Sequence, residues 1–215
     1  MDDSLVINPF CYSYNSTNFK LSLKEKCLLE RGKMVLLNGK SGTGKSTFIK
    51  IISGEISTEA VNGKIKSIKY FNDTSMLGSR NLLDEITLSV DEEVDTTRLN
   101  QILVGVQLSY RFKTIDELSK VSCKELSNGL LQRALLARAL YNLEDSDIVC
   151  IDEPIGSLDE ENAKEVISFV KDFCNRYKKR FIILCTHQHK FVREYIDNVI
   201  SIEQISSLES EVKLN

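Results

Sequence analysis

A short glycine-rich segment, residues 39–46, restricts the possible folds of this chain more than any other part of its sequence. It reads Gly-Lys-Ser-Gly-Thr-Gly-Lys-Ser and matches the phosphate-binding pattern G-x-x-x-x-G-K-[ST]. The apolar residues 34–37 before it are typical of a buried strand, and a helix is expected from about Ser46. In that context the N–H groups of the turn point inward and the start of the helix adds partial positive charge, so the segment predicts a phosphate-binding turn.

Strand and helix patterns alternate along the second half of the chain. Residues 147–152 and 180–186 are predicted as buried strands, and residues 160–177 between them as an amphipathic helix. The apolar stripe of this helix consists of Ala163, Val166, Ile167, Val170, Phe173 and Cys174. Such alternation around a phosphate-binding turn predicts an α/β fold, in which helices cover both faces of a mostly parallel sheet.

The remaining segments predict additions to this core. Residues 4–14 and 19–29 are predicted as short strands of an antiparallel β flap, and residues 65–71 as one more strand. Residues 82–120 have helix-like spacing with loop breaks, which we interpret as a helical lobe, and residues 127–141 favour a further helix. The 215 residues contain no internal repeat and no proline-rich linker, so we expect one domain.

Composition and charge argue against several classes of protein. The net charge of −3 gives no overall basic field, so no nucleic acid partner is expected. The longest apolar runs are far shorter than the roughly 18–20 residues of a membrane-spanning helix, and the acidic N-terminus does not resemble a secretory signal, so a cytoplasmic protein is expected. The six cysteines are widely spaced without a C-x-x-C pair, which favours buried thiols over a zinc site or a disulfide framework.

Four side chains are predicted to act on a bound nucleoside triphosphate. Lys45 would reach the β- and γ-phosphates, and Ser46 would offer its hydroxyl to Mg²⁺. Asp152, at the end of the strand predicted over residues 147–152, would hold the water shell of the metal. Glu153 comes next in the chain and is placed to accept a proton from the attacking water.

Four more segments, taken with the phosphate-binding turn, make the chain similar to ABC-type ATPases. Residues 126–130, Leu-Ser-Asn-Gly-Leu, resemble the family signature L-S-G-G-Q, and residues 156–159, Gly-Ser-Leu-Asp, resemble the D-loop. Thr186 and His187 resemble the histidine switch, and residues 10–12, Phe-Cys-Tyr, resemble the aromatic platform for adenine. All occur in the family's order, and together they cover residues 10 to about 203.

The resemblance implies the fold and the ligands in more detail. It implies a single ABC ATPase domain over residues 1–215, with a P-loop NTPase (RecA-like) core and a helical lobe inserted at about residues 82–127. The cofactors would be ATP and Mg²⁺. Two chains would form a head-to-tail dimer, either a homodimer or a heterodimer with another ABC domain, and each ATP would lie between the phosphate loop of one chain and the signature of the other.

The site residues follow from matching each family motif to this sequence. Lys45, Glu153 and His187 would be catalytic, and His189 is interpreted as structural. Ser46, Asp152 and Asp73 would be the metal ligands. The residues implied to contact ATP are Tyr12, Gly39, Lys40, Ser41, Gly42, Thr43, Gly44, Lys45, Ser46, Thr47, Ser127 and Gly129.

Three positions depart from the family pattern. Asp73 stands where the family's glutamine loop has its glutamine, Asn128 replaces the first glycine of the signature, and Leu130 replaces the signature glutamine. We expect weakened or altered coupling and slow ATP hydrolysis. Because Lys45 and Glu153 are retained, we also hypothesise an asymmetric pair, in which this chain works with a different ABC domain.

The leading interpretation is an ATP-hydrolysing subunit that energises a membrane transporter. It would dock on separate transmembrane subunits through the helical lobe and would lie on the cytoplasmic face of the membrane through that partner. The short segment between Ser46 and Asp73 and residues 81–85 look most like exporter-type domains. The alternatives are a soluble ABC ATPase without a membrane partner and a weakly hydrolysing, ATP-binding regulatory module.

Overall fold

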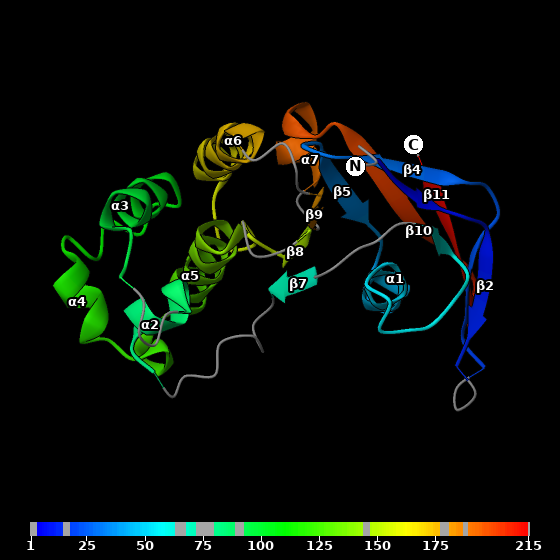
Figure 1. The fold of residues 1–215 in the computed structure, drawn as a ribbon, viewed down its shortest axis with the longest axis horizontal. Coiled ribbons are helices and arrows are strands. Elements are labelled where there is room, and N and C mark those ends of the chain that lie inside the picture. Colours follow the sequence, from blue (N-terminus) through cyan, green and yellow to red (C-terminus); the bar gives the residue numbers. More distant parts are fainter. Residues whose placement is uncertain are drawn as a thin grey trace.

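A mostly parallel sheet forms the centre of the computed structural model, which describes residues 4–14, 18–62, 68–71, 80–88, 93–143, 147–176, 181–186 and 189–214 (Figure 1). Its strands are β2 (Phe10–Ser13), β3 (Lys20–Leu23), β5 (Met34–Asn38), β7 (Ile68–Phe71), β8 (Ile148–Asp152), β9 (Phe181–Cys185), β10 (Asn198–Ser206) and β11 (Glu209–Leu214). They lie in the order β2-β3-β11-β10-β5-β9-β8-β7. From β10 to β7 all neighbours are parallel, which confirms the predicted α/β fold.

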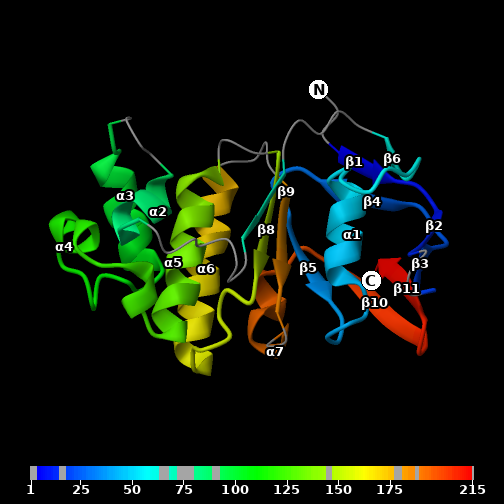
Figure 2. The same ribbon diagram turned by 90° about the horizontal axis from the view of Figure 1, so that it is seen from below.

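Helices cover both faces of the parallel strands, as Figure 2 shows. Helix α1 (Lys45–Ile52) lies on one face, and α5 (Asn128–Tyr141) and α6 (Glu160–Arg176) lie on the other. The buried residues of α6 are the six predicted from its apolar stripe. The remaining short helical turns are η2 (Cys123–Glu125), α7 (His189–Val192) and η4 (Arg193–Tyr195).

The two faces of the sheet belong to two hydrophobic cores. In β8, Val149 and Ile151 pack into the core beneath α5 and α6, whereas Ile148 and Cys150 pack into the core that contains α1. Successive side chains of a strand point to opposite faces, so a strand covered on both faces needs an unbroken apolar run. This explains why the strands around the phosphate-binding turn were recognisable in the sequence.

Three short helices make up the part of the chain that was predicted as a helical lobe. They are α2 (Leu82–Thr87), α3 (Thr96–Gly105) and α4 (Ile115–Ser119), and they lie at the end of the molecule away from the N-terminal strands (Figure 1). Each begins at a residue whose side chain accepts a backbone hydrogen bond, namely Asn81, Asp95 and Thr114. The buried apolar residues of these helices join the core beneath α5 and α6.

The predicted antiparallel flap is only partly correct. Strands β1 (Ser4–Ile7), β4 (Cys27–Glu30) and β6 (Val61–Asn62) form a separate three-stranded antiparallel sheet. Strands β2 and β3, from the same region of the sequence, instead extend the main sheet, because β3 pairs in parallel with β11. Strand β11 lies within residues 204–215, which carry no motif that we could interpret, and it pairs antiparallel with β10.

No helix within the described ranges has both the length and the apolar character needed to cross a membrane.

Candidate functional site

The phosphate-binding turn lies between β5 and α1, where the sequence predicted it. Gly42 and Gly44 have φ angles of 79° and 103°, which side chains other than glycine rarely adopt. Gly44 is also the residue at the start of α1, and a Cβ there would lie 3.0 Å from the ring of Phe19. Glycine at position 44 therefore meets two demands, a left-handed backbone and a close aromatic neighbour.

Hydrogen bonds within the turn hold its curved shape. The buried hydroxyl of Thr43 donates to the carbonyl of Lys40 at 2.9 Å. The ammonium of Lys45 donates to the carbonyls of Gly39 and Lys40 at 2.7 and 3.2 Å, so the Lys45 Nζ is folded back over the turn. The positive charge of Lys45 is thus held at the start of α1, where an anion is also favoured by the helix dipole.

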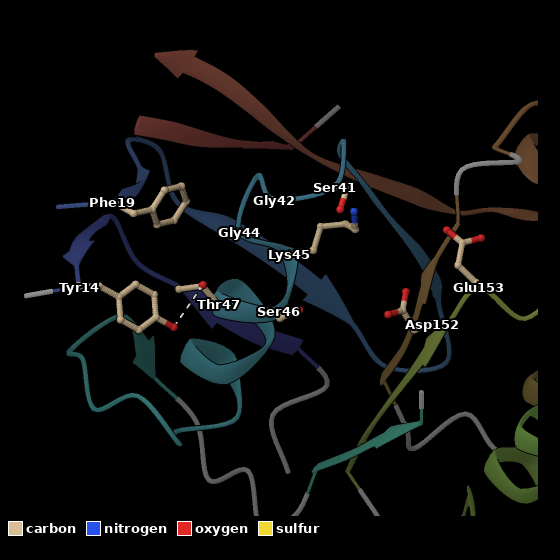
Figure 3. Close-up of a pocket in the computed structure, with 10 residues that line it drawn as sticks. All are labelled: Tyr14, Phe19, Ser41, Gly42, Gly44, Lys45, Ser46, Thr47, Asp152 and Glu153. Atoms are coloured by element: carbon tan, nitrogen blue, oxygen red, sulfur yellow. Dashed lines mark hydrogen bonds between the residues drawn. The ribbon is translucent and has the colours of Figure 1, made fainter. Parts of the chain in front are cut away.

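A cavity of about 660 Å³ joins the turn to the two acidic residues at the end of β8 (Figure 3). Its lining residues are Tyr14, Phe19, Ser41, Gly42, Gly44, Lys45, Ser46, Thr47, Asp152 and Glu153. Sequence reasoning assigned eight of these to the site, and it missed Tyr14 and Phe19. The structure thus brings together the lysine, the hydroxyl and the two carboxylates that a phosphate-transfer site requires.

Glu153 is fixed by the neighbouring strand β9. The register of β8 and β9 places Asp152 beside Cys185, and the Glu153 N–H donates to the Cys185 carbonyl at 2.7 Å. Glu153 then turns the chain away with a φ of 46°. Its Oε2 accepts a hydrogen bond of 3.1 Å from the hydroxyl of Thr186.

The thiol of Cys185, which pairs with Asp152 in the sheet, is expected to be unreactive. Burial raises the pKa of the Cys185 thiol, and the negative charge of Asp152 raises it further, while Lys45 acts in the opposite direction. Cys185 therefore stays protonated at neutral pH and serves as a small apolar side chain.

The aromatic side chains at the other end of the cavity are Tyr14 and Phe19. They come from the hairpin that joins β2 to β3, in which the Tyr14 N–H donates to the Phe19 carbonyl at 3.1 Å. The Tyr14 hydroxyl lies 3.4 Å from the Thr47 hydroxyl at the start of α1. Tyr12, the predicted adenine platform, does not line the cavity; its ring meets that of Tyr14 edge-on, with the centroids 5.0 Å apart.

A signal for Tyr14 was present in the sequence. Residues two apart on a strand share a face. Tyr12 lies on β2, so Tyr14, two residues later, is expected on the same face and closer to the hairpin turn between β2 and β3. Phe19 follows where the chain returns from that turn. The choice between Tyr12 and Tyr14 depended on where β2 ends, and single-sequence patterns fix strand ends poorly.

The predicted signature residues lie apart from the cavity. Ser127 is exposed at the start of α5 and accepts a hydrogen bond from the Leu130 N–H at 3.4 Å. Gly129 packs against the predicted D-loop, because a Cβ at this position would lie 2.8 Å from the Ser157 hydroxyl. Since α5 and α1 cover opposite faces of the sheet (Figure 2), the start of α5 does not reach the phosphate-binding turn of its own chain.

The departures from the family pattern have different surroundings. Asn128 is exposed in the first turn of α5, whereas Leu130 is partly buried and packs against the core beneath α5 and α6. Leucine at position 130 thus supplies packing where the family's glutamine would supply a polar group. Asp73 and His187 lie outside the described residues, and His189 begins α7.

The cavity contains oxygen ligands that suit Mg²⁺. Ser46 offers a hydroxyl and Asp152 a carboxylate, and both line the same space. In proteins Mg²⁺ is usually held by one or two carboxylates together with substrate phosphates and water. Among the described residues no group of three or more His, Cys, Asp or Glu side chains forms a metal cage.

Comparisons with known proteins show what the chain as a whole is similar to. The sequence model of the family described as ABC transporter matches residues 25–156, more than half of the chain. An ABC transporter ATP-binding protein/permease of Acanthamoeba polyphaga mimivirus is 30% identical over 217 residues, which cover 92% of this chain but only 40% of that relative. The thiamine import ATP-binding protein of Haemophilus influenzae is 31% identical over 196 residues, which cover 84% of this chain and 89% of that protein.

A solved structure supports the fold. The structure of RNase-L Inhibitor aligns with 97% of this chain and 38% of its own, with a TM-score of 0.74 and 22% sequence identity. At that identity the similarity establishes a shared fold and nothing about the substrate.

Proposed function

Because the chain belongs to the ABC transporter family of ATP-binding proteins, we propose that it binds Mg-ATP and hydrolyses it to drive a membrane transporter. The observation that carries this proposal is that Lys45, Ser46, Asp152 and Glu153 line one cavity. These are the groups that phosphate binding, metal binding and proton transfer require.

The phosphate-binding turn holds the triphosphate. Its inward N–H groups and the start of α1 attract the phosphate oxygens, and Lys45 adds a full positive charge at the β- and γ-phosphates. Tyr14 and Phe19 lie at the far end of the same cavity, where the purine ring stacks against them.

Ser46 and Asp152 would hold a magnesium ion. When bound, Mg²⁺ neutralises charge that develops on the phosphate oxygens. Asp152 points into the cavity from the end of β8, and Ser46 lies opposite it in the first turn of α1 (Figure 3). The two residues therefore approach the phosphates from different elements of the fold.

Glu153 accepts the proton of the attacking water. The water oxygen forms a bond to the γ-phosphorus while the bond from that phosphorus to the β–γ bridging oxygen breaks, so ADP leaves with the bonding electron pair and inorganic phosphate is released. Glu153 lines the cavity one residue beyond Asp152, so base and metal ligand share one strand end.

A second chain completes each site in this proposal. Ser127 and Gly129 lie at the exposed start of α5, which as a helix N-terminus favours an anion, yet they do not line the cavity of their own chain. A head-to-tail dimer would bring them to the γ-phosphate of the partner. The replacements at Asn128 and Leu130 weaken that contribution, which favours a partner with a more typical signature.

The membrane subunits are separate chains, and this subunit lies on the cytoplasmic face through them. The 31% identity to a protein named as a thiamine import ATP-binding protein, with no permease in its name, supports this proposal. The mimivirus relative, by contrast, is named as an ATP-binding protein/permease and is more than twice as long as the matched segment.

The test uses the Glu153→Gln variant as an ATP-bound trap. Wild-type protein should release phosphate from Mg-ATP, and Glu153→Gln should bind ATP but release phosphate at least about 100-fold more slowly. The trapped variant is then used to capture partners from detergent-solubilised membranes and from cytosol. Recovery of a polytopic membrane protein supports transport, whereas recovery of soluble complexes alone overturns that part of the proposal.

A further inference from the structure

The hydroxyl of Thr186 touches the carboxylate that we propose as the catalytic base. It donates to Glu153 Oε2 at 3.1 Å. Only 3% of Thr186 is exposed, so solvent competes little for this hydrogen bond. The contact joins the end of β9 to the end of β8, two strands that are adjacent in the sheet.

The backbone leaves little freedom in this contact. Asp152 pairs with Cys185, so the next residues along the two strands, Glu153 and Thr186, also lie close to each other. The Glu153 N–H is bonded to the Cys185 carbonyl at 2.7 Å, and the left-handed φ of 46° sets the direction in which the Glu153 side chain leaves the strand. The backbone thus fixes where the Glu153 side chain starts and in which direction it leaves the strand. Only the rotatable bonds within the side chain are left to be set.

Those rotatable bonds are what Thr186 restrains. A glutamate has three of them, and the last one has a broad range, so the torsion alone leaves the plane of the carboxylate and the direction of each oxygen poorly defined. A hydrogen bond to Oε2 defines where Oε1 points. In enzymes a misplacement of about 1 Å at the reacting group can lower the rate about 100-fold.

We propose that Thr186 is a positioning residue for Glu153, whose hydroxyl fixes Oε2 and so orients Oε1 toward the attacking water. The inference rests on the proposed function, because it takes Glu153 as the base for ATP hydrolysis. Thr186 itself transfers no proton and contacts no phosphate in this proposal.

Two matched pairs of variants isolate the hydroxyl. Thr186→Val keeps the branched shape and loses the hydroxyl. Thr186→Ser keeps the hydroxyl and loses the methyl group, and Thr186→Ala differs from it only in lacking the hydroxyl. We expect kcat to fall about 10- to 100-fold in the Val and Ala variants and to stay within about threefold of wild type in the Ser variant, with the KM for ATP nearly constant throughout. Because the Ser and Ala variants both lack the methyl group and differ only in the hydroxyl, their comparison holds even if Thr186→Val does not fold.

A combination with Glu153→Gln separates positioning from general stability. If Thr186 acts only through Glu153, adding Thr186→Val to Glu153→Gln should lower the residual rate no further. A purely structural role would instead lower that rate again, together with the thermal midpoint.

The outcomes also distinguish this inference from the proposed function. Equal kcat values for Thr186→Ala and Thr186→Ser, in a protein whose hydrolysis depends on Glu153, overturn the positioning role and leave the function standing. A further loss in the double variant overturns it as well. Wild-type protein that releases no phosphate with its captured partners present overturns the proposed function, and this inference with it.

Discussion

The guanidinium of Arg138 on α5 donates a hydrogen bond of 3.2 Å to the carboxylate of Glu85 on α2. Both side chains are largely buried, with 13% and 4% exposed. The pair ties the helix that follows the predicted signature to the first helix of the lobe. Burial lowers the pKa of Arg138 and the charge of Glu85 opposes that effect, so the pair is held together by the same low-dielectric surroundings that make each charge costly alone.

Replacing Glu85 by glutamine should therefore destabilise the protein strongly. Glu85→Gln removes the Glu85 charge from beside the largely buried Arg138 guanidinium, and the free energy of unfolding should fall by about 3 kcal/mol. Urea denaturation at neutral pH measures the change. The control is Glu203→Gln, which breaks the exposed pair of Glu203 with Lys213 and should have no measurable effect. Equal stability of wild type and Glu85→Gln would show that the pair does not stabilise the contact between α2 and α5.

Asp197 should make stability depend on pH in the acid range. Burial alone would raise the pKa of Asp197, but hydrogen bonds from Lys171 and the Met34 N–H, with the charges of Lys171 and Lys33, outweigh it and hold the pKa below its ordinary value. A carboxyl with a lowered pKa stabilises the fold above its unfolded value, about 3.9, and loses that effect as the pH falls through the folded value.

The variant Asp197→Asn tests this dependence. At pH 7 it should be less stable than wild type by about 1 kcal/mol, a modest figure because the group is partly exposed. As the pH falls below the unfolded value and through the lowered folded pKa of Asp197, the difference between the two proteins should shrink, because the protonated aspartic acid is neutral like asparagine. A difference that is the same at pH 7 and pH 3 would mean that the charge of Asp197 does not contribute.

The parts of the fold that could be predicted are those with a strong local period. The apolar residues of α6 recur every three or four positions, which indicates a helix with one buried face. The strands around the phosphate-binding turn are unbroken apolar runs, which indicates strands that are covered on both faces. Strand β11 lacks such a pattern because one of its two buried positions is Ser210, which hides the alternation. Strand β11 pairs with β3, so that Glu209 lies beside Lys20. These residues are far apart in the sequence, and a local sequence pattern cannot predict such a contact.

The candidate site shows the same division. The sequence predicted four residues that line the cavity, Lys45, Ser46, Asp152 and Glu153. The first two belong to the glycine-rich motif, which defines the local backbone, and the other two come at the end of a predicted strand. Tyr14 and Phe19 were missed, since the loop that carries them is defined by the hairpin and not by a motif. The chemical roles of all these residues stay predictions until the variants are measured.

Tyr14 should contribute more to nucleotide affinity than Tyr12. Tyr14 lines the cavity and Tyr12 lies behind it. Stacking of a base on an aromatic ring contributes about 1–3 kcal/mol, so Tyr14→Ala should weaken ATP binding roughly 5- to 150-fold. Titration of ATP into proteins that also carry Glu153→Gln measures affinity without hydrolysis. Tyr12→Ala is the matched control and should change the affinity less than threefold. A larger loss of ATP affinity in Tyr12→Ala than in Tyr14→Ala would show that Tyr12 is the residue that stacks on the adenine.

Gly129→Ala should slow hydrolysis through a contact within the chain. The new methyl group would lie 2.8 Å from the Ser157 hydroxyl and 3.3 Å from its Cβ. The Gly129 carbonyl is held by Arg133, whose guanidinium also donates to the Gln107 carbonyl, so the first turn of α5 has little room to yield. The strain therefore falls on Ser157, whose side chain must rotate or shift residues 156–159. These residues follow Glu153 closely, and we expect kcat to fall about 10-fold or more.

The double variant Gly129→Ala with Ser157→Gly identifies the cause of that loss. Alanine favours a helix over glycine by up to about 1 kcal/mol, which offsets part of the strain of the new contact. The thermal midpoint is measured alongside the rate, and a slower rate in a protein that is still folded at the assay temperature is not caused by unfolding. Removing the Ser157 side chain makes room for the methyl group and should restore most of the hydrolysis rate. If the double variant is as slow as Gly129→Ala alone, the methyl group acts outside this contact, and the close approach of a partner's phosphate to the Gly129 backbone becomes the better explanation.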